Sequence, residues 1–389
     1  RDLHYPLRRQ RQMCIRERIM DCEDGRLYHF RPMNSLAIYA GPSALQRITN
    51  EGFKPEHFKL MLGASGGPKW FVLFGLDRYL FGNFFSNRKE SLYTIGSSVG
   101  AWRMCCLAAS DPAKCVDRLA NYYCHEDYSH MTSVGEVTES ARVMLEKILI
   151  DDSKTKVVHN KVFKTHIVTV RSKGVNSSAG DFAHALHLGL SAVCNVFTRG
   201  SLRHFFDRSI FTNDMVTSPW SDSAVVDSIS PLTEANLIDA LLASGSIPFV
   251  LEGVNNIPGS RLGRYWDGGI LDYHFDWPFL ESDNDLVLYP HYSSELIPGW
   301  FDKKLPWRKV KDSQLDKVVL LTPTTEFVRN LPGSKIPDRT DFKHMPFDYR
   351  VEVWEEVMRR SESLAVELDE LIARGEVSSI VRPIKERLR

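Results

Sequence analysis

The sequence predicts an α/β fold in which helices cover both faces of a parallel or mixed sheet. Short apolar runs alternate with helical segments from about residue 58 onward, and this alternation is typical of such sheets. The composition, 43% hydrophobic and 25% charged, is that of a globular chain that buries a large core. The length of 389 residues suits roughly two or three average domains, but one large α/β domain with extensions fits it equally well.

The expected strands are short and apolar. Five segments have the length and composition of buried strands, namely residues 58–62, 91–95, 162–170, 286–289 and 318–321. Glycine-rich turns follow the first two, which predicts that the chain passes directly from strand to helix at these points.

Three helices are expected between these strands. Residues 70–85 predict one long and largely buried helix, and residues 99–109 predict a second. Residues 234–243 predict a third, with Thr233 as its N-cap.

The C-terminal part predicts a loop and then an amphipathic helix. Four prolines within residues 323–346 indicate a long loop. The apolar residues that follow share one helical face, and Gly375 is a suitable C-terminal stop. We therefore divide the chain into a basic N-terminal arm (1–34), a main domain (35–322) and a C-terminal extension (323–389) that packs on it. The apolar face comprises Trp354, Val357, Met358, Leu364, Ala365, Leu368, Leu371 and Ile372.

Charge and cysteine content exclude several functions. Lys plus Arg equals Asp plus Glu at 49 each, whereas binding to nucleic acid through phosphate contacts needs a basic excess. The cysteines form no C-x-x-C pair, so neither a zinc site nor a disulfide scaffold is expected. A reducing compartment, and so a cytoplasmic protein, is the simpler interpretation. No apolar run approaches the ~20 residues of a membrane-spanning helix. We interpret the basic chain ends as solvated tails, with peripheral contact to anionic lipid headgroups as the alternative.

The first chemical motif is the pentapeptide G-x-S-x-G at residues 96–100. It follows a predicted strand and opens a predicted helix, which is the context that a nucleophilic serine requires. Gly96 and Gly100 remove side chains that would collide across the tight turn. Ser98 would then lie at a helix N-terminus, where the helix dipole favours developing negative charge, whereas Ser97 should point elsewhere. The alternative is a chance Gly/Ser turn.

A second turn, at residues 63–70, is also rich in glycine and also lies between a strand and a helix. The backbone N–H groups of Gly66 and Gly67, with Lys69 as a further candidate, are able to hold an oxyanion. Pro68 has no N–H but suits the first turn of a helix. The segment nearly imitates a P-loop, but the proline and the missing Ser or Thr exclude that interpretation.

The third motif is Asp-Gly-Gly at residues 267–269. Asp-Gly is a common hairpin dipeptide, so a plain turn is one interpretation. The other is that the Asp267 carboxylate accepts the proton of Ser98 as the serine attacks a substrate.

The order of these motifs resembles that of the patatin-like phospholipase family. A fourth segment, A-S-G-S-I-P-F at residues 243–249, is similar to the A-S-x-A-x-P-x-x-F block of that family, and the resemblance extends over residues 36–321. It implies a three-layer α/β/α fold and a serine lipid acyl hydrolase that works through an acyl-enzyme. It implies phospholipid, lysophospholipid or neutral acyl-ester substrates, and the chemistry needs no metal and no organic cofactor.

The family roles fall on individual residues of this sequence. The resemblance implies that Ser98 is the nucleophile and Asp267 the second member of a Ser–Asp dyad. It assigns the oxyanion loop to Gly66, Gly67 and Lys69. The glycines that support the two motifs are Gly96, Gly100, Gly268 and Gly269.

Three positions depart from the family pattern. Ser65 and Trp70 stand where the oxyanion loop usually has glycine, and Ser246 replaces an alanine. We expect these changes to affect the geometry of the loop more than the dyad, and we expect the bulky Trp70 to shape or partly block the acyl pocket.

Two alternatives remain open at this stage. A Ser-His-Asp hydrolase would use the same Ser98 turn with His274 or His291, but it leaves the Gly-rich turn and the Asp-Gly-Gly block unexplained. The other is a non-catalytic lipid-binding or interaction module on the same fold. His184 and His187 lie three apart on an apparent helix, and we interpret them as structural because no further ligand cluster accompanies them.

Overall fold

The computed structural model describes residues 34–174, 180–221, 223–279 and 285–388. The expected N-terminal arm, residues 1–34, lies outside them except for its last residue. The fold below is that of the unit that begins at Asn34.

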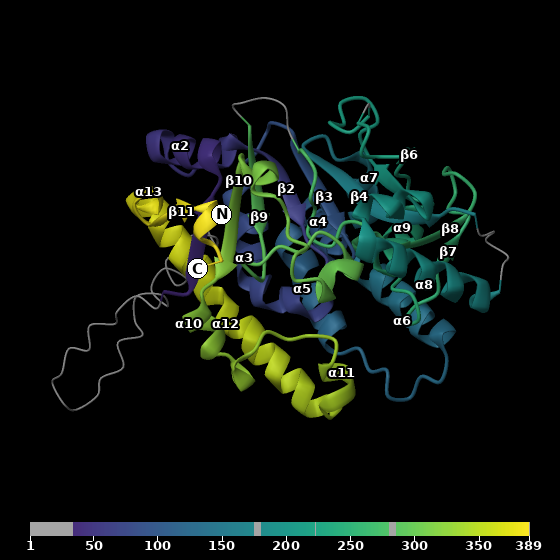
Figure 1. The fold of residues 1–389 in the computed structure, drawn as a ribbon. Coiled ribbons are helices and arrows are strands. Elements are labelled where there is room, and N and C mark those ends of the chain that lie inside the picture. Colours follow the sequence, from purple (N-terminus) through teal and green to yellow (C-terminus); the bar gives the residue numbers. More distant parts are fainter. Residues whose placement is uncertain (1–33, 175–179, 222, 280–284, 389) are drawn as a thin grey trace, which may run out of the picture. The chain divides into compact units, whose positions relative to one another are not determined.

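One mixed sheet runs through the described residues (Figure 1). Its strands follow the order β11-β1-β10-β9-β2-β3-β4-β5-β6, and β8 pairs with both β4 and β7. Neighbouring strands from β10 to β4 are parallel, whereas β1, β5 and β8 run antiparallel to their partners β10, β4 and β4. The strands are β1 (Leu36–Ala40), β2 (Phe58–Gly63), β3 (Leu92–Ser97), β4 (Phe163–Ser172), β5 (Phe206–Thr212), β6 (Ser228–Pro231), β7 (Val254–Asn255), β8 (Arg264–Asp267), β9 (Leu286–Pro290), β10 (Val318–Pro323) and β11 (Arg382–Pro383).

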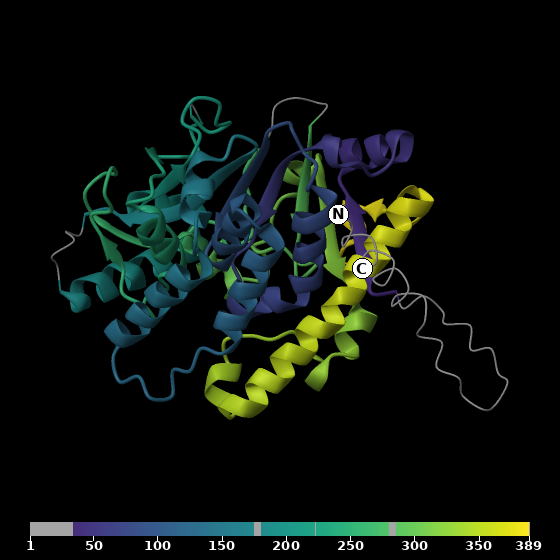
Figure 2. The ribbon, with the colours of Figure 1, turned by 180° about the vertical axis from the view of Figure 1, so that it is seen from behind.

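Helices cover both faces of this sheet, which confirms the three-layer α/β/α fold. Figure 2 shows α3, α4 and α5 together on one face. On the other side a second, smaller apolar cluster contains Leu188 of α8 and Leu202 of the following 3-10 helix, η4 (Arg199–His204). The α-helices are α2 (Pro42–Glu51), α3 (Phe74–Tyr79), α4 (Val99–Ala108), α5 (Pro112–Cys124), α6 (Val134–Ile148), α7 (Ser153–His159), α8 (Asp181–Phe197), α9 (Leu237–Gly245), α10 (Thr325–Arg329), α11 (Asp341–His344), α12 (Phe347–Arg374) and α13 (Val377–Ile380).

Strand pairing brings the predicted motifs together at one edge of the sheet. Gly63 at the end of β2 is in register with Gly96 near the end of β3, because parallel strands present their carboxyl ends at the same edge. On β4, Val168 pairs with Ser97, and the next residue, Thr169, pairs with Asp267. Because β5 occupies one side of β4 along residues 166–172, β3 and β8 lie one after the other on its other side, and the turn after β3 meets the end of β8 there.

The five expected strands are confirmed within a residue or two, but the expected helix at 70–85 is wrong as one element. The chain forms a 3-10 helix, η2 (Gly67–Leu73), then α3, then a π-helical turn, η3 (Leu80–Phe84). Packing against α12 explains part of the break. The Gly75 amide donates to Ser361 Oγ at 2.9 Å, so a side chain of α12 takes the place of a helical carbonyl.

Two further local expectations need correction. Thr233 is not an N-cap, because α9 begins at Leu237 after Asn236, and the Thr233 amide instead donates to Asn236 Oδ1. The Pro-rich stretch 323–346 is not all loop, since α10, the 3-10 turn η8 (Pro332–Ser334) and α11 lie within it. The amphipathic C-terminal helix is confirmed as α12, which ends at Gly375 in the left-handed conformation and packs on η2 and α3.

Candidate active site

Ser98 occupies a strained turn between β3 and α4. Its φ of 57° and ψ of −136° lie in a region that non-glycine residues rarely adopt. The residue occupies the N-cap position of α4, where its side chain makes no capping hydrogen bond, and is 3% exposed. Ser97, one position earlier, instead accepts a hydrogen bond from Ser65 Oγ at 2.9 Å. The turn thus presents one serine to the site and turns its neighbour away, as expected for this motif.

The glycines around this turn are required by close backbone approach. A Cβ on Gly100 would lie 2.0 Å from the Gly63 carbonyl oxygen, and a Cβ on Gly96 would lie 2.5 Å from backbone atoms of Ala101. These contacts join the turn after β2 to the turn after β3. The sequence pattern predicted the need for glycine here, and the structure adds the partner strand that imposes it.

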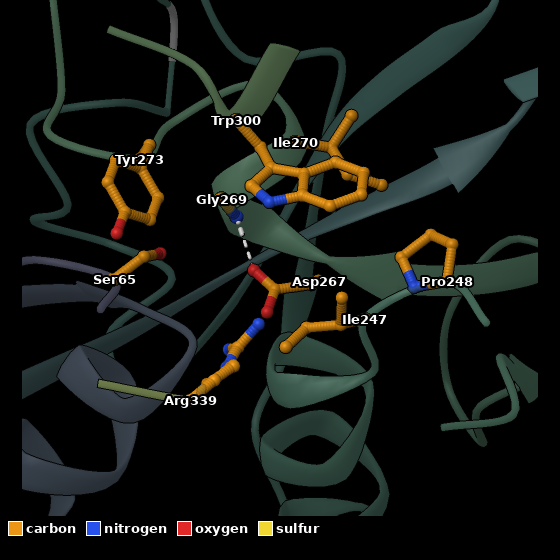
Figure 3. Close-up of a pocket in the computed structure, with 9 residues that line it drawn as sticks. All are labelled: Ser65, Ile247, Pro248, Asp267, Gly269, Ile270, Tyr273, Trp300 and Arg339. Carbon is orange, nitrogen blue, oxygen red and sulfur yellow. Dashed lines mark hydrogen bonds between the residues drawn. The ribbon is translucent and has the colours of Figure 1, made fainter. Parts of the chain in front are cut away.

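The Ser98 hydroxyl donates to Asp267 Oδ2 at 2.7 Å. The other oxygen of this carboxylate, Oδ1, accepts the Gly269 amide at 2.6 Å (Figure 3). Glycine is required in this turn as well, because a Cβ on Gly268 would lie 2.4 Å from the Val168 carbonyl oxygen. The predicted meeting of positions 98 and 267 is therefore present in the fold, and Asp267 is fixed by its own turn.

The last turn of α9 and the residue after it connect both partners. Ser244 Oγ accepts the Ser98 amide at 2.9 Å and donates to the Val168 carbonyl at 2.7 Å. Two residues later, the Ser246 carbonyl accepts the Asp267 amide at 2.9 Å. Through these hydrogen bonds, the fourth sequence motif holds the Ser98 turn next to the end of β8.

Burial raises the pKa of Asp267 above its ordinary value of 3.8. The Arg339 guanidinium, the Ser98 hydroxyl and the Gly269 amide oppose this shift, because each stabilises the ionised form. Figure 3 shows the Arg339 side chain pointing toward Asp267. The site therefore contains a buried carboxylate of increased basicity, hydrogen-bonded to a serine hydroxyl, which is the arrangement that activates a nucleophile.

The predicted oxyanion loop lies beside this pair. Gly67 adopts a left-handed φ of +56°, and a Cβ there would lie 2.9 Å from Arg339 Nε. Gly67 and Ser98 both line the same cavity. A Cβ on Gly66 would lie 2.5 Å from the Tyr292 ring. The Lys69 side chain extends over that ring, with Nζ 5.3 Å from its centroid, and burial lowers its pKa.

The departures from the family pattern are accommodated by local contacts. The amide of Ser65 donates to the Tyr273 carbonyl, and its own carbonyl accepts the Tyr292 hydroxyl at 2.9 Å. Trp70 is fully buried, with its ring 5.0 Å from that of Phe71. Because Trp70 is outside the walls of both cavities at the site, the expectation that it shapes or blocks the acyl pocket is wrong.

Two cavities meet at the Ser98–Asp267 pair. The larger, of about 520 Å³, has mainly apolar and aromatic walls that include Trp102, Tyr123 and Phe249, and its volume lies within the range of about 300–1,000 Å³ typical of ligand pockets. The smaller one, of about 10 Å³, lies on the Asp267 side (Figure 3). Arg339 and Ile247 line both.

The two histidines considered for a triad have other partners. His274 Nδ1 accepts the Ile297 amide at 2.8 Å, and its Nε2 lies 2.6 Å from the Tyr292 hydroxyl. His291 Nδ1 is engaged by the backbone of Ser293. Burial lowers the pKa of both rings, for His291 to about 3. This geometry gives the dyad interpretation more support than the triad.

The histidines of α8 are also used structurally. His184 is buried with its ring 5.9 Å from that of Trp266, and His187 Nε2 lies 3.0 Å from the Phe205 carbonyl oxygen. Among the residues that the structure describes, no cluster of His, Cys, Asp and Glu side chains is suited to a metal ion. Within the same residues, no helix combines the length and apolar character needed to span a membrane.

Sequence reasoning missed Arg339 and Tyr123. Arg339 lies in the Pro-rich stretch expected to be a loop, with no neighbouring motif to mark it. Tyr123 lies at the end of α5, and burial raises the pKa of its hydroxyl to about 12, opposed by Arg339. Only the tertiary structure places these two residues on the wall of the cavity that contains Ser98.

Comparison with known families agrees with this geometry. The family model described as patatin-like phospholipase matches residues 92–274, which include both Ser98 and Asp267. This part of the chain is similar to the patatin-like phospholipase family. Patatin-like proteins are generally hydrolases of lipid esters. The Gly-rich turn at 63–70, the predicted oxyanion loop, lies before the matched segment, and the pairing of β2 with β3 joins it to that segment. A search of curated proteins finds no match to the chain.

Proposed function

We propose that this protein is a serine lipid acyl hydrolase in which Ser98 and Asp267 form a catalytic dyad. The observation that carries the proposal is the 2.7 Å hydrogen bond from Ser98 Oγ to Asp267 Oδ2 at the wall of a large apolar cavity. A hydrolase of long acyl chains needs both parts, a nucleophile with a base and an apolar volume for the chain.

The proposed reaction has two halves. Asp267 takes the Ser98 proton while Ser98 Oγ attacks the ester carbonyl, and Asp267 then gives this proton to the leaving alcohol as the acyl-enzyme forms. In the second half Asp267 takes a proton from the water that attacks the acyl-enzyme, and it returns this proton to Ser98 Oγ as the fatty acid leaves. The amides of Gly66 and Gly67 hold the oxyanion, for which the left-handed turn at Gly67 and its place in the Ser98 cavity are the support.

The cavity also supports a substrate class. Its charged lining residues are Arg339 and Lys343, both cationic, and the remaining wall is apolar or uncharged. Such a wall favours an ester that carries a phosphate near the scissile bond, because both cations stabilise the anionic group in a partly buried site. We therefore propose phospholipids or lysophospholipids rather than neutral glycerides as the preferred substrates.

The test is acyl release from matched lipids together with active-serine labelling. A fluorophosphonate probe should label the wild type and not Ser98→Ala, and hydrolysis should fall at least about 10³-fold in the variant. A folded wild-type sample that resists the probe would favour the non-catalytic lipid-binding module.

Two comparisons separate the finer parts of this proposal. His274→Gln should retain activity in proportion to its folded fraction, and a folded but inactive variant would restore the triad. Faster release from triacylglycerol than from a phospholipid of the same acyl chain would contradict the proposed substrate class and leave the dyad standing.

A further inference from the structure

The helix α8 is amphipathic in the opposite sense to an ordinary surface helix. Its outward side is apolar, with six large side chains that are between 47% and 84% exposed. A surface helix of a globular protein normally turns its apolar stripe inward. We call these six residues the outer face of α8: Phe182, Leu186, Leu190, Val193, Val196 and Phe197.

The inward side of α8 is largely polar and is held by hydrogen bonds. His184, Ser191 and Asn195 are buried there. Asn195 Nδ2 donates to Asp302 Oδ1 at 2.8 Å, and the Asn195 carbonyl accepts Arg308 Nη2 at 3.0 Å. Because these contacts fix the rotation of the helix, its apolar side is held outward by the fold itself. The six side chains recur every three or four residues along α8, so they lie on one side of the helix. Exposed apolar patches of this kind mark interaction surfaces.

The charges beside this patch indicate what covers it. The 3-10 helices η4 and η6 (Trp300–Lys304) pack on α8. Their one acidic residue, Asp302, is 1% exposed and forms an ion pair with Arg199. Their other charged residues include Arg203 and Lys304, which are both cationic and exposed.

An exposed tryptophan completes the pattern. Trp307 is 65% exposed. The next residue, Arg308, contacts α8, so Trp307 lies beside that helix. Apolar residues flanked by exposed cations and tryptophan are typical of segments that lie in the interface of an anionic bilayer. We propose that the outer face of α8 docks on the surface of an anionic lipid bilayer, with Arg203 and Lys304 against the headgroups.

This surface connects to the candidate active site. The helix η6, which packs on α8, also packs on the turn η5 (Gly268–Ile270) next to Asp267. Its Trp300 lines the small cavity beside that carboxylate (Figure 3). Docking through α8 would hold the edge of the site close to a membrane. The docking itself goes beyond the proposed function and does not depend on it.

The test is co-sedimentation of the full chain with vesicles, in a Ser98→Ala background so that hydrolysis plays no part. The matched substitutions are Val193→Glu on α8 and Val366→Glu on α12, at positions that are 59% and 55% exposed. Both remove an exposed valine from a helix and add one negative charge. We expect Val193→Glu to lower binding to phosphatidylserine-containing vesicles at least about tenfold, because burying an aliphatic side chain is worth that factor or more. Val366→Glu should bind like the parent chain.

Further experiments distinguish an anionic bilayer from other partners of this face. Replacing phosphatidylserine with phosphatidylcholine, or combining Arg203→Gln with Lys304→Gln, should weaken binding, since both remove the headgroup attraction. Equal binding of the two valine variants, or none by the parent chain, would overturn the proposal. So would a dimer that Val193→Glu converts to monomer in sedimentation velocity, because the face would then cover a second copy. These results are independent of whether Ser98 is a nucleophile.

Discussion

At the scale of the residue, the site depends on the state of one carboxylate. Asp267 is buried, which raises its pKa, while three neighbouring groups partly restore the charged form. A buried aspartate of raised pKa is a better base than a free one as long as it is ionised at the working pH.

Asp267→Asn should therefore lower acyl release by about 10²–10⁴-fold, the usual contribution of a positioned general base. In the wild type, the rate should fall on the acidic side with a midpoint above pH 3.8, which is the ordinary pKa of an aspartate. The measurement is the rate on a soluble ester from acidic to neutral pH. A limb below that value, or an Asn variant with wild-type rates, would contradict the role assigned to Asp267.

The same substitution has a predicted effect on stability. Because the pKa is higher in the folded than in the unfolded state, the ionised carboxylate costs stability above the folded pKa, and that cost disappears as the pH falls through it. Asp267→Asn should thus unfold at the same temperature as the wild type or higher at neutral pH, with the gain shrinking in acid. Thermal unfolding at two pH values measures this, and a lower melting temperature at neutral pH would argue that the carboxylate is structural.

At the scale of the element, two strand–turn–helix units meet with almost no space between them. A Cβ on Gly100 would overlap the Gly63 carbonyl oxygen, which is a backbone atom. The overlap could be relieved only by moving the backbone of β2 or α4, and with it the Ser98 turn.

Gly100→Ala is expected to destabilise the protein by about 1–3 kcal/mol or more, the usual cost of overpacking, and to reduce labelling of Ser98 in the fraction that folds. Gly189→Ala is the matched control, because nothing lies within 4 Å of a Cβ at that helical position. The control should gain about 0.5–1 kcal/mol from helix propensity. Chemical denaturation of both variants checks the pair, and equal stabilities would show that the close approach is not rigid.

At the scale of the whole molecule, a buried ion pair fixes the helix that carries Ser98. Arg103 of α4 forms two hydrogen bonds to Asp77 of α3, at 2.6 and 2.8 Å, and both side chains are fully buried. The helix α3 in turn packs against α12 from the C-terminal part of the chain. The ion pair thus connects the candidate site to the C-terminal helix.

Asp77→Ala should cost about 3–5 kcal/mol, because it leaves the Arg103 guanidinium buried without its counter-ion. Replacing both members with Leu should recover much of that loss, since two apolar residues leave no charge to solvate. Urea unfolding of the single and double variants tests this, and a double variant as unstable as Asp77→Ala would show that packing, rather than the unpaired charge, causes the loss.

Sequence alone determined the elements whose cause is local. Tight turns demand glycine and buried strands demand apolar runs. The sequence therefore predicted the three glycine-containing turns, at Ser98, at residues 63–70 and at Asp267, and the strands before the first two. Tertiary structure decided what depends on distant partners. It joined Ser98 to Asp267 across 169 positions, brought Arg339 to the cavity and paired Asp77 with Arg103. It also turned the apolar side of α8 outward, because a helical period shows that two faces differ but not which of them the fold will bury.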